Sequence, residues 1–395
     1  MSKNKSKGPS KSKSTFTVDD LISKANDALN KLQPDLACKF YQKALQMEPQ
    51  NTNIMDALAD VLIQLGQSSE ALNLLTQSTL IAPNENPYKW LFLAQLQTGI
   101  DAMESYNRGI ILLTSVTNDP EINNVEGKLE FFNKQISKAY CSIAELYLTD
   151  LCYEEGAENK CEEAIIKALA INSTSLDAHQ AMASLRFSQN RSLDACNIME
   201  KVYTTVKESI DKFTARTVIE EISPDQEDDL EDAPEPEFCV ATSKLLIECA
   251  AINPKFADYA MTLISDLLRQ DDENVELWYM MGVAALGSQP VDIEAAKIHL
   301  EHAKTMMDGI REEVKMVGEQ FPYDEQYILV MEHLQILEQH IQDNPNSLIE
   351  ERDDENDEND EDDENDEDDE NDEDDEDEMI EESNNANDDE EEWSD

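Results

Sequence analysis

Two consecutive stretches of 34 residues carry the same pattern. Residues 18–51 read VDDLISKANDALNKLQPDLACKFYQKALQMEPQN, and residues 52–85 read TNIMDALADVLIQLGQSSEALNLLTQSTLIAPNE. Seven positions of the first stretch match seven positions of the second at a constant offset of 34 residues, with no gap. In the first stretch they are Leu21, Ala25, Ala28, Ala37, Tyr41, Ala44 and Pro49, and in the second they are Met55, Ala59, Leu62, Ala71, Leu75, Ser78 and Pro83. Small residues let neighbouring helices approach closely, and each proline stops a helix because it lacks an amide donor. Each stretch is therefore predicted to form a pair of helices.

This period and these residue classes are typical of the tetratricopeptide repeat (TPR). Three weaker copies follow: one begins at Trp90, one comes after an insertion around residues 118–127, and one contains Ala183 and Ala195. Among the later copies, residues 278–303 fit the repeat best. We therefore expect an all-α fold, a TPR superhelix over residues 17–343. An amphipathic helix at about 321–343 is predicted to cap it, with its apolar residues covering the last repeat. Those residues are Ile328, Met331, Leu334, Ile336, Leu337 and Ile341.

The sixth unit is the least regular. Residues 202–222 are predicted to be its first helix and residues 242–254 its second, and a further pair is predicted to begin near Ala260. Between the two helices, residues 223–237 read SPDQEDDLEDAPEPE, which predicts an exposed acidic loop insertion because it combines acids with prolines.

Acidic residues dominate the charge of the chain. There are 88 Asp and Glu against 30 Lys and Arg, which gives a net charge of −58. Residues 1–16 carry five lysines and predict a disordered Lys-rich arm, whereas residues 350–395 hold 32 acids and one base and place a disordered acidic tail at 344–395. A net charge of −32 remains for residues 17–349. This balance argues against direct binding of nucleic acid or an anionic membrane and favours a basic protein partner.

No motif in the sequence predicts catalysis. There is no glycine-rich phosphate loop, no nucleophile elbow and no zinc-protease motif, so we expect neither an enzyme nor a cofactor nor a metal site. The seven cysteines are odd in number and lack C-x-x-C spacing, which indicates free thiols in a reducing compartment. Without a membrane-spanning or signal-like apolar run, the chain is expected to be soluble and intracellular.

TPR geometry predicts a binding groove. The first helix of each pair lines the concave surface of such arrays, and residues beside the packing positions point into it. These positions are Asp19, Asn26, Asp56, Asp60, Tyr88, Gln95, Glu145, Asp177, Phe187, Glu276 and Tyr279. Carboxylates with interspersed aromatic rings suit a peptide rich in Arg and Lys, through charge-assisted hydrogen bonds and cation–π contacts. The alternative is a solvated acidic face without a partner.

The overall organisation resembles a known family. A Lys-rich N-terminus, an acidic TPR array with an acidic insertion and a tail rich in Asp, Glu and Asn are similar to the fungal TPR-containing dedicated assembly chaperones of large-subunit ribosomal protein four. The resemblance implies a chaperone that shields this basic ribosomal protein in its groove and delivers it to nuclear pre-60S particles. It also implies residence in cytoplasm and nucleus, and we expect a monomer apart from the client. Composition alone leaves two alternatives open, an acidic TPR histone chaperone and a TPR scaffold subunit.

Overall fold

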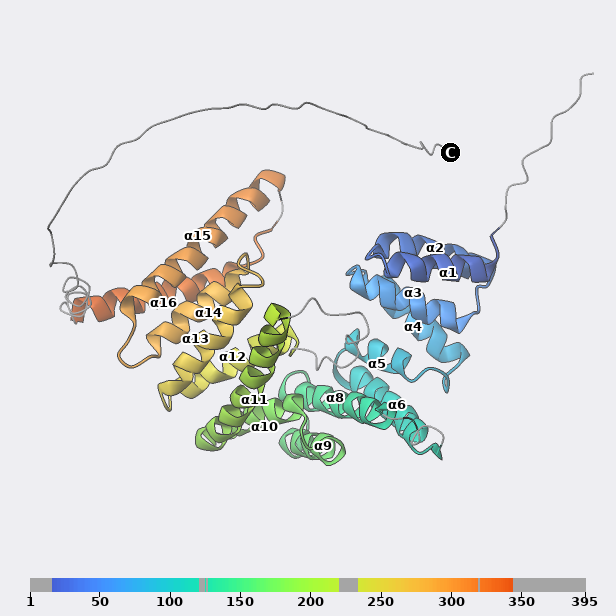
Figure 1. Cartoon of the computed structure of the whole chain (residues 1–395), viewed down its shortest axis with the longest axis horizontal. Helices are drawn as coiled ribbons and strands as arrows, with labels where there is room; N and C mark the ends of the chain where they lie inside the picture. The colour runs from blue at the N-terminus through green and yellow to red at the C-terminus, as the bar shows by residue number, and fades with distance from the viewer. Residues whose placement is uncertain (1–15, 121–124, 126, 220–233, 319, 344–395) are drawn as a thin grey trace, which may run out of the picture. The chain divides into compact units, whose positions relative to one another are not determined.

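The computed structural model describes residues 16–120, 125, 127–219, 234–318 and 320–343, and these residues form helices and no strand. Consecutive helices pack in pairs, which follow one another in chain order in Figure 1. The pairs are α1 (Val18–Leu29) with α2 (Pro34–Met47), α3 (Thr52–Gln64) with α4 (Ser68–Ile81), α5 (Tyr88–Gln95) with α6 (Gly99–Thr117), α8 (Lys128–Leu148) with α9 (Ala157–Ile171), α10 (Leu176–Ser188) with α11 (Ser192–Ile219), α12 (Pro236–Ala250) with α13 (Lys255–Leu268), and α14 (Val275–Leu286) with α15 (Ile293–Val317). The last described helix is α16 (Asp324–Asp343). The predicted all-α repeat fold is confirmed.

The first two repeats form as the sequence pattern predicts. Apart from the two prolines, which are exposed, the repeated positions are all buried, from Leu21 in α1 to Ser78 in α4. At the start of α1, the Thr17 hydroxyl accepts a hydrogen bond from the Asp20 amide while the Asp20 carboxylate accepts one from the Thr17 amide. This capping box satisfies amides that lack partners within the helix.

None of the helices described has the length and apolar character needed to cross a lipid bilayer.

The middle of the array differs from the predicted register. Residues 202–219 continue α11, the second helix of the fifth pair, because no proline or glycine interrupts the helix after Ser192. The helix expected to be second in the next unit is its first helix, α12, and α13 completes the pair. Pro254 stands at the N-terminus of α13, where a proline is tolerated, rather than at the end of a pair. The predicted acidic insertion ends earlier than expected, since Pro236 begins α12; residues 220–233 lie outside the described part.

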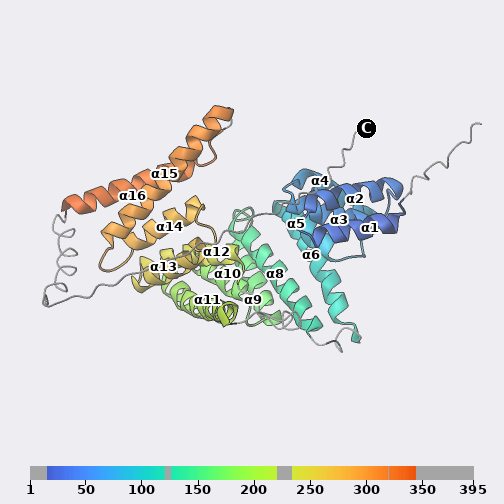
Figure 2. The ribbon, with the colours of Figure 1, turned by 45° about the horizontal axis from the view of Figure 1, so that its top comes forward.

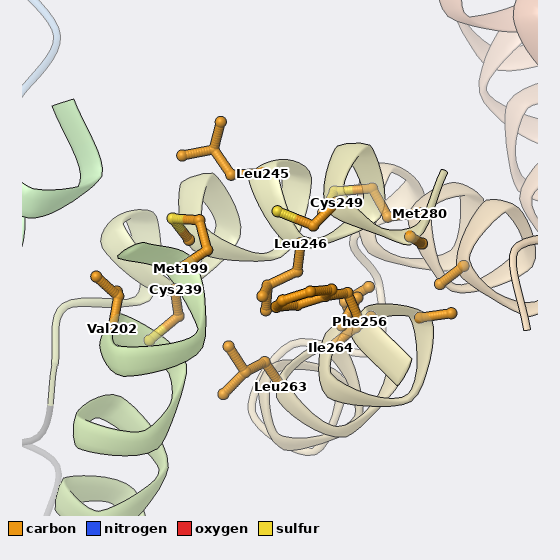
Figure 3. Packing of buried hydrophobic residues seen from close by; sticks show 14 of the residues in the cluster. Met199, Val202, Cys239, Leu245, Leu246, Cys249, Phe256, Leu263, Ile264 and Met280 are labelled. Carbon is orange, nitrogen blue, oxygen red and sulfur yellow. The ribbon is translucent and has the colours of Figure 1, made fainter. Parts of the chain in front are cut away.

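A continuous apolar core joins these central helices. Met199 and Val202 of α11 belong to one buried cluster with Leu246 of α12 and Leu263 of α13, which Figure 3 shows from close by. The Phe256 ring is 2% exposed and packs in the same cluster. This core fixes α12 beside α10, which decides the site described below.

The C-terminal helices close the described array. Gly282 in α14 lies so close to α15 that a Cβ atom there would stand 2.6 Å from Leu300 Cγ. Helix α16 buries Val330 and Leu337 against its neighbours, and Leu334 and Ile341 are half-buried. Through these residues α16 packs on α15 and α14. In contrast, three other residues assigned to the covered face are exposed, namely Ile328, Met331 and Ile336. The predictions for residues 1–15 and 344–395 lie outside the described residues.

Candidate protein-binding site

The first helices of the later pairs form one connected layer. Helix α8 contacts α10, α10 contacts α12, and α12 contacts α14. Figures 1 and 2 show α10 between α8 and α12. We call the surface that these four helices share the first-helix face. It contains Glu145 of α8, Asp177 of α10 and Glu276 of α14, so the structure brings together three acids that the sequence assigned to separate repeats.

A cavity of about 410 Å³ opens on the first-helix face between α8, α10 and α12. Seven of its twelve lining residues are polar or charged, and the others contribute apolar surface. Its lining residues are Lys138, Cys141, Ser142, Glu145, Leu148, Asp177, Gln180, Ala181, Ser184, Ala241, Lys244 and Leu245. The Gln180 side chain donates hydrogen bonds to the Thr242 hydroxyl at 2.9 Å and to the Phe238 carbonyl at 3.3 Å. These bonds fix α10 against α12 beside the cavity.

The charges in the cavity are not balanced within it. Lys138 Nζ lies 2.9 Å from a carboxylate oxygen of Glu235, and Lys244 Nζ lies 2.7 Å from one of Glu276. Both lysines are thus paired with acids that do not line the cavity. Among the residues that the structure describes, Glu145 and Asp177 take part in no ion pair. The cavity therefore offers two carboxylates to an incoming cation.

The two carboxylates affect the pKa of the Cys141 thiol, which also lines the cavity. Burial raises the pKa of Cys141 to about 12, and the negative charges of Asp177 and Glu145 add to the effect. Burial lowers the pKa of Lys138, but the hydrogen bond that its ammonium donates to Glu235 and the charge of Asp177 outweigh burial and leave that pKa above its ordinary value. A protonated thiol is a poor nucleophile, and no cluster of metal-ligating side chains occurs in the described part of the chain. The carboxylates of Glu145 and Asp177 can form ion pairs with a positively charged side chain.

In the N-terminal repeats, the predicted site residues Asp19, Asn26 and Gln95 are exposed and Asp60 is half-buried. The Tyr41 hydroxyl donates a 2.6 Å hydrogen bond to the Asn26 side chain. Burial raises the pKa of Tyr41, and the charge of Asp60 raises it further, which places Asp60 near the same hydroxyl. These side chains are compatible with the predicted face.

Asp56 is the exception among the predicted acids. It is 9% exposed, and its carboxylate accepts hydrogen bonds from the Ser78 hydroxyl at 2.5 Å and from the Asn86 amide at 2.7 Å. Ser78 in turn accepts from the fully buried Lys89 ammonium through its carbonyl at 3.2 Å and its hydroxyl at 3.3 Å. This network ties α3, α4 and the start of α5 together. We therefore assign Asp56 to the core rather than to the binding site.

The three predicted aromatic residues also belong mainly to the packing. Phe187 packs on the central core, and the Tyr88 hydroxyl is buried without a hydrogen-bond partner in the described residues. Burial raises the pKa of Tyr88. The Tyr279 ring stands 5.6 Å from the His333 ring of α16, centroid to centroid. All three are half-buried in these contacts, so we do not retain them as exposed cation–π platforms.

Sequence reasoning missed both lysines of the cavity. Lys138 lies two helical turns before Glu145 on the same helix, a spacing that places both on one side of α8. The sequence pattern does not indicate Lys244, because it predicts a second helix over residues 242–254, whose side chains would face away from the predicted groove. A correct register for residues 200–270 would have identified it.

The fold and this face define the class of the protein: it is an array of tetratricopeptide repeats that presents acidic side chains on its first helices. A family model described as tetratricopeptide repeat matches residues 33–96. A solved structure titled "Assembly Chaperone of RpL4 (Acl4) (Residues 1-338)" covers 68% of this chain and 95% of that chain, with a TM-score of 0.54 and 23% identity. This likeness supports the fold.

Two fungal proteins are similar in sequence. A Schizosaccharomyces pombe protein described as "Probable assembly chaperone of rpl4" is 30% identical over 228 residues, 57% of this chain and 58% of that protein. An Emericella nidulans protein of the same description is 25% identical over 297 residues, 70% of this chain and 67% of that protein. The match thus spans less than two thirds of the S. pombe protein. The resemblance to the fungal TPR-containing assembly chaperones is confirmed.

Proposed function

We propose that the chain is a dedicated ribosome-assembly chaperone that binds a newly made, basic large-subunit ribosomal protein, ribosomal protein four, through its first-helix face. The observation that carries the proposal is the cavity in which Glu145 and Asp177 form no ion pair with any described residue, while Lys138 and Lys244 are each paired with an acid outside it. The descriptions of the two fungal relatives support the identity of the client.

The charge arrangement explains how such a client could be held. A Lys or Arg side chain that enters the cavity would meet two carboxylates in a partly dehydrated site, where an ion pair is stronger than at an open surface. The net charge of −58 would attract a basic chain from a distance and increase the association rate. Acids on the protein replace the phosphates that the client meets in ribosomal RNA, so RNA can compete for the same basic residues. Binding and release require no covalent step.

The proposal extends to where the protein works. A chaperone that takes up the client after synthesis and releases it on nuclear pre-60S particles must be present in cytoplasm and nucleus. It would act as a monomer apart from its client, since one first-helix face suffices for one basic segment.

Co-purification tests the identity of the client. The full chain, tagged and isolated from cells at low and high salt, should carry one dominant ribosomal protein of the large subunit in mass spectrometry. Core histones in its place would establish the histone-chaperone alternative. Non-basic partners in fixed stoichiometry that survive high salt would establish a scaffold subunit, and either result would overturn the proposal.

A further inference from the structure

A second hollow, of about 760 Å³, lies between α15 and α16, away from the first-helix face cavity. Figures 1 and 2 show these two helices side by side at the end of the described array. We call this hollow the end groove. Its lining residues are Glu301, Lys304 and Thr305 of α15 and Tyr327, Ile328, Met331, Glu332, Leu334, Gln335 and Glu338 of α16.

The floor of the end groove is apolar and open to solvent. Ile328 is 57% exposed and Met331 is 42% exposed, although both belong to a helix that already buries Val330 and Leu337 against its neighbours. A terminal helix that only caps a repeat array needs a polar outer face. The outer face of α16 instead exposes apolar residues in the groove, which indicates a surface that is covered by a partner.

The rim of the end groove is acidic. Glu301, Glu332 and Glu338 line it, and the described residues provide no ion pair for any of these carboxylates. The only cation in the lining, Lys304, lies 2.7 Å from a carboxylate oxygen of Asp308. The groove therefore combines an apolar floor with three carboxylates available to a cationic partner.

We propose that the end groove binds a basic amphipathic helix supplied by the client protein. Apolar side chains spaced three and four residues apart on such a helix would pack on Ile328 and Met331, and the flanking Lys or Arg side chains would reach the three glutamates. This gives the chaperone a second contact, on a different pair of helices from the acidic cavity. The inference rests on the proposed function only for the identity of the protein that supplies the helix.

Charge complementarity selects this occupant over the chain's own tail. Residues 350–395 carry 32 acids and one base, so their approach would place carboxylates against carboxylates. A second copy of the groove would be repelled for the same reason, because it would bring the same three glutamates to the contact.

The test uses the full chain and a fluorescent Leu/Lys peptide of about 18 residues, five helical turns, with its leucines on one face. A peptide of the same composition in scrambled order controls for charge alone. Fluorescence anisotropy should show that the amphipathic peptide binds about tenfold more tightly than the scrambled one. Ile328→Glu should weaken that binding about tenfold, whereas Ile336→Glu should change it less than about twofold.

The two isoleucines form a matched pair. Both are 57% exposed and stand on α16, but only Ile328 lines the end groove. Equal effects of the two substitutions, or equal binding of both peptides, would overturn the proposal. Thermal unfolding of both variants should match the unchanged chain, because neither side chain is buried. If wild-type protein sediments as a dimer that Ile328→Glu dissociates, a second copy occupies the groove and the proposal is wrong. If the full chain binds the amphipathic peptide as expected but no ribosomal protein co-purifies with it from cells, only the identity of the client is refuted.

Discussion

Replacing Asp56 by alanine should damage the N-terminal repeats without acting through the binding face. The substitution removes the acceptor for the Ser78 hydroxyl and the Asn86 amide, and it leaves the Lys89 ammonium buried with no carboxylate in its network. A buried donor that loses its acceptor costs about 1–3 kcal/mol, so the loss of both bonds to Asp56 should cost about 4 kcal/mol. Asp60, half-buried one turn further along α3, is the control: Asp60→Ala should change stability by about 0.5 kcal/mol or less.

Hydrogen exchange measured peptide by peptide is the suitable assay, because repeats open locally. In Asp56→Ala, the amides of α3, α4 and α5 should exchange at least about a hundredfold faster, the equivalent of about 3 kcal/mol. Adding Lys89→Met should recover part of the loss, since it removes a buried positive charge that no carboxylate in the network then balances. If Asp56→Ala and Asp60→Ala exchanged equally slowly, or if Lys89→Met worsened the single variant, the assignment of this network to the core would be refuted.

Further expectations concern packing, pH and salt. Gly282→Ala should lower the thermal unfolding temperature by the equivalent of about 1–3 kcal/mol, because its Cβ would meet Leu300. Gly309 has open space around it, so Gly309→Ala should be neutral or stabilising by up to about 1 kcal/mol. The reverse order of the two unfolding temperatures would contradict the packing. Burial raises the thiol pKa of Cys141 to about 12 and of Cys161 to about 11, from an ordinary 9.0. The folded chain therefore keeps protons that the unfolded chain loses, and stability that is complete below pH 9 should fall by up to about 1.4 kcal/mol per pH unit and thiol as the pH rises towards 11. The urea concentration at the midpoint of unfolding, measured between pH 8 and 10, follows this loss of stability. In Cys161→Ala the midpoint should fall less steeply with pH, and an equally steep fall in that variant would contradict the role of this thiol. Client binding should weaken steadily between 50 and 300 mM salt, which titration calorimetry can follow, and a salt-independent affinity would argue against recognition by charge.

The sequence predicts the first two repeats because their period is uninterrupted. Ala25, Ala37, Ala59 and Ala71 mark the close helix contacts directly, so pattern alone gives both the helices and their register. The register fails after residue 200, where α11 runs on to Ile219 without a breaker and Pro254 stands between the two helices of a pair, at the N-terminus of α13, instead of after the second helix. Proline marks a helix boundary but does not say on which side the helix lies.

The candidate site was predictable where it depends on helix position and not where it depends on distant partners. Glu145 and Asp177 were placed on first helices correctly, since that follows from the repeat period. Burial of Asp56 could not be read from its own helix, because its partners Ser78 and Asn86 lie 22 and 30 residues further along the chain. One signal was available: Ser78 occupies a packing position that is alanine in the first repeat, and a buried hydroxyl needs a partner.

Charge reversal on the first-helix face tests the central claim most directly. Titration calorimetry with purified ribosomal protein four should compare the unchanged chain, the double variant Glu145→Lys with Asp177→Lys, and a control, Glu208→Lys with Asp258→Lys, which makes the same change in net charge on the second helices α11 and α13. We predict at least about a hundredfold loss of affinity in the first variant, roughly 1.4 kcal/mol for each lost carboxylate, and less than about threefold in the control. Equal losses in both variants would mean that net charge alone attracts the client, and unchanged binding in the first would mean that the client binds elsewhere.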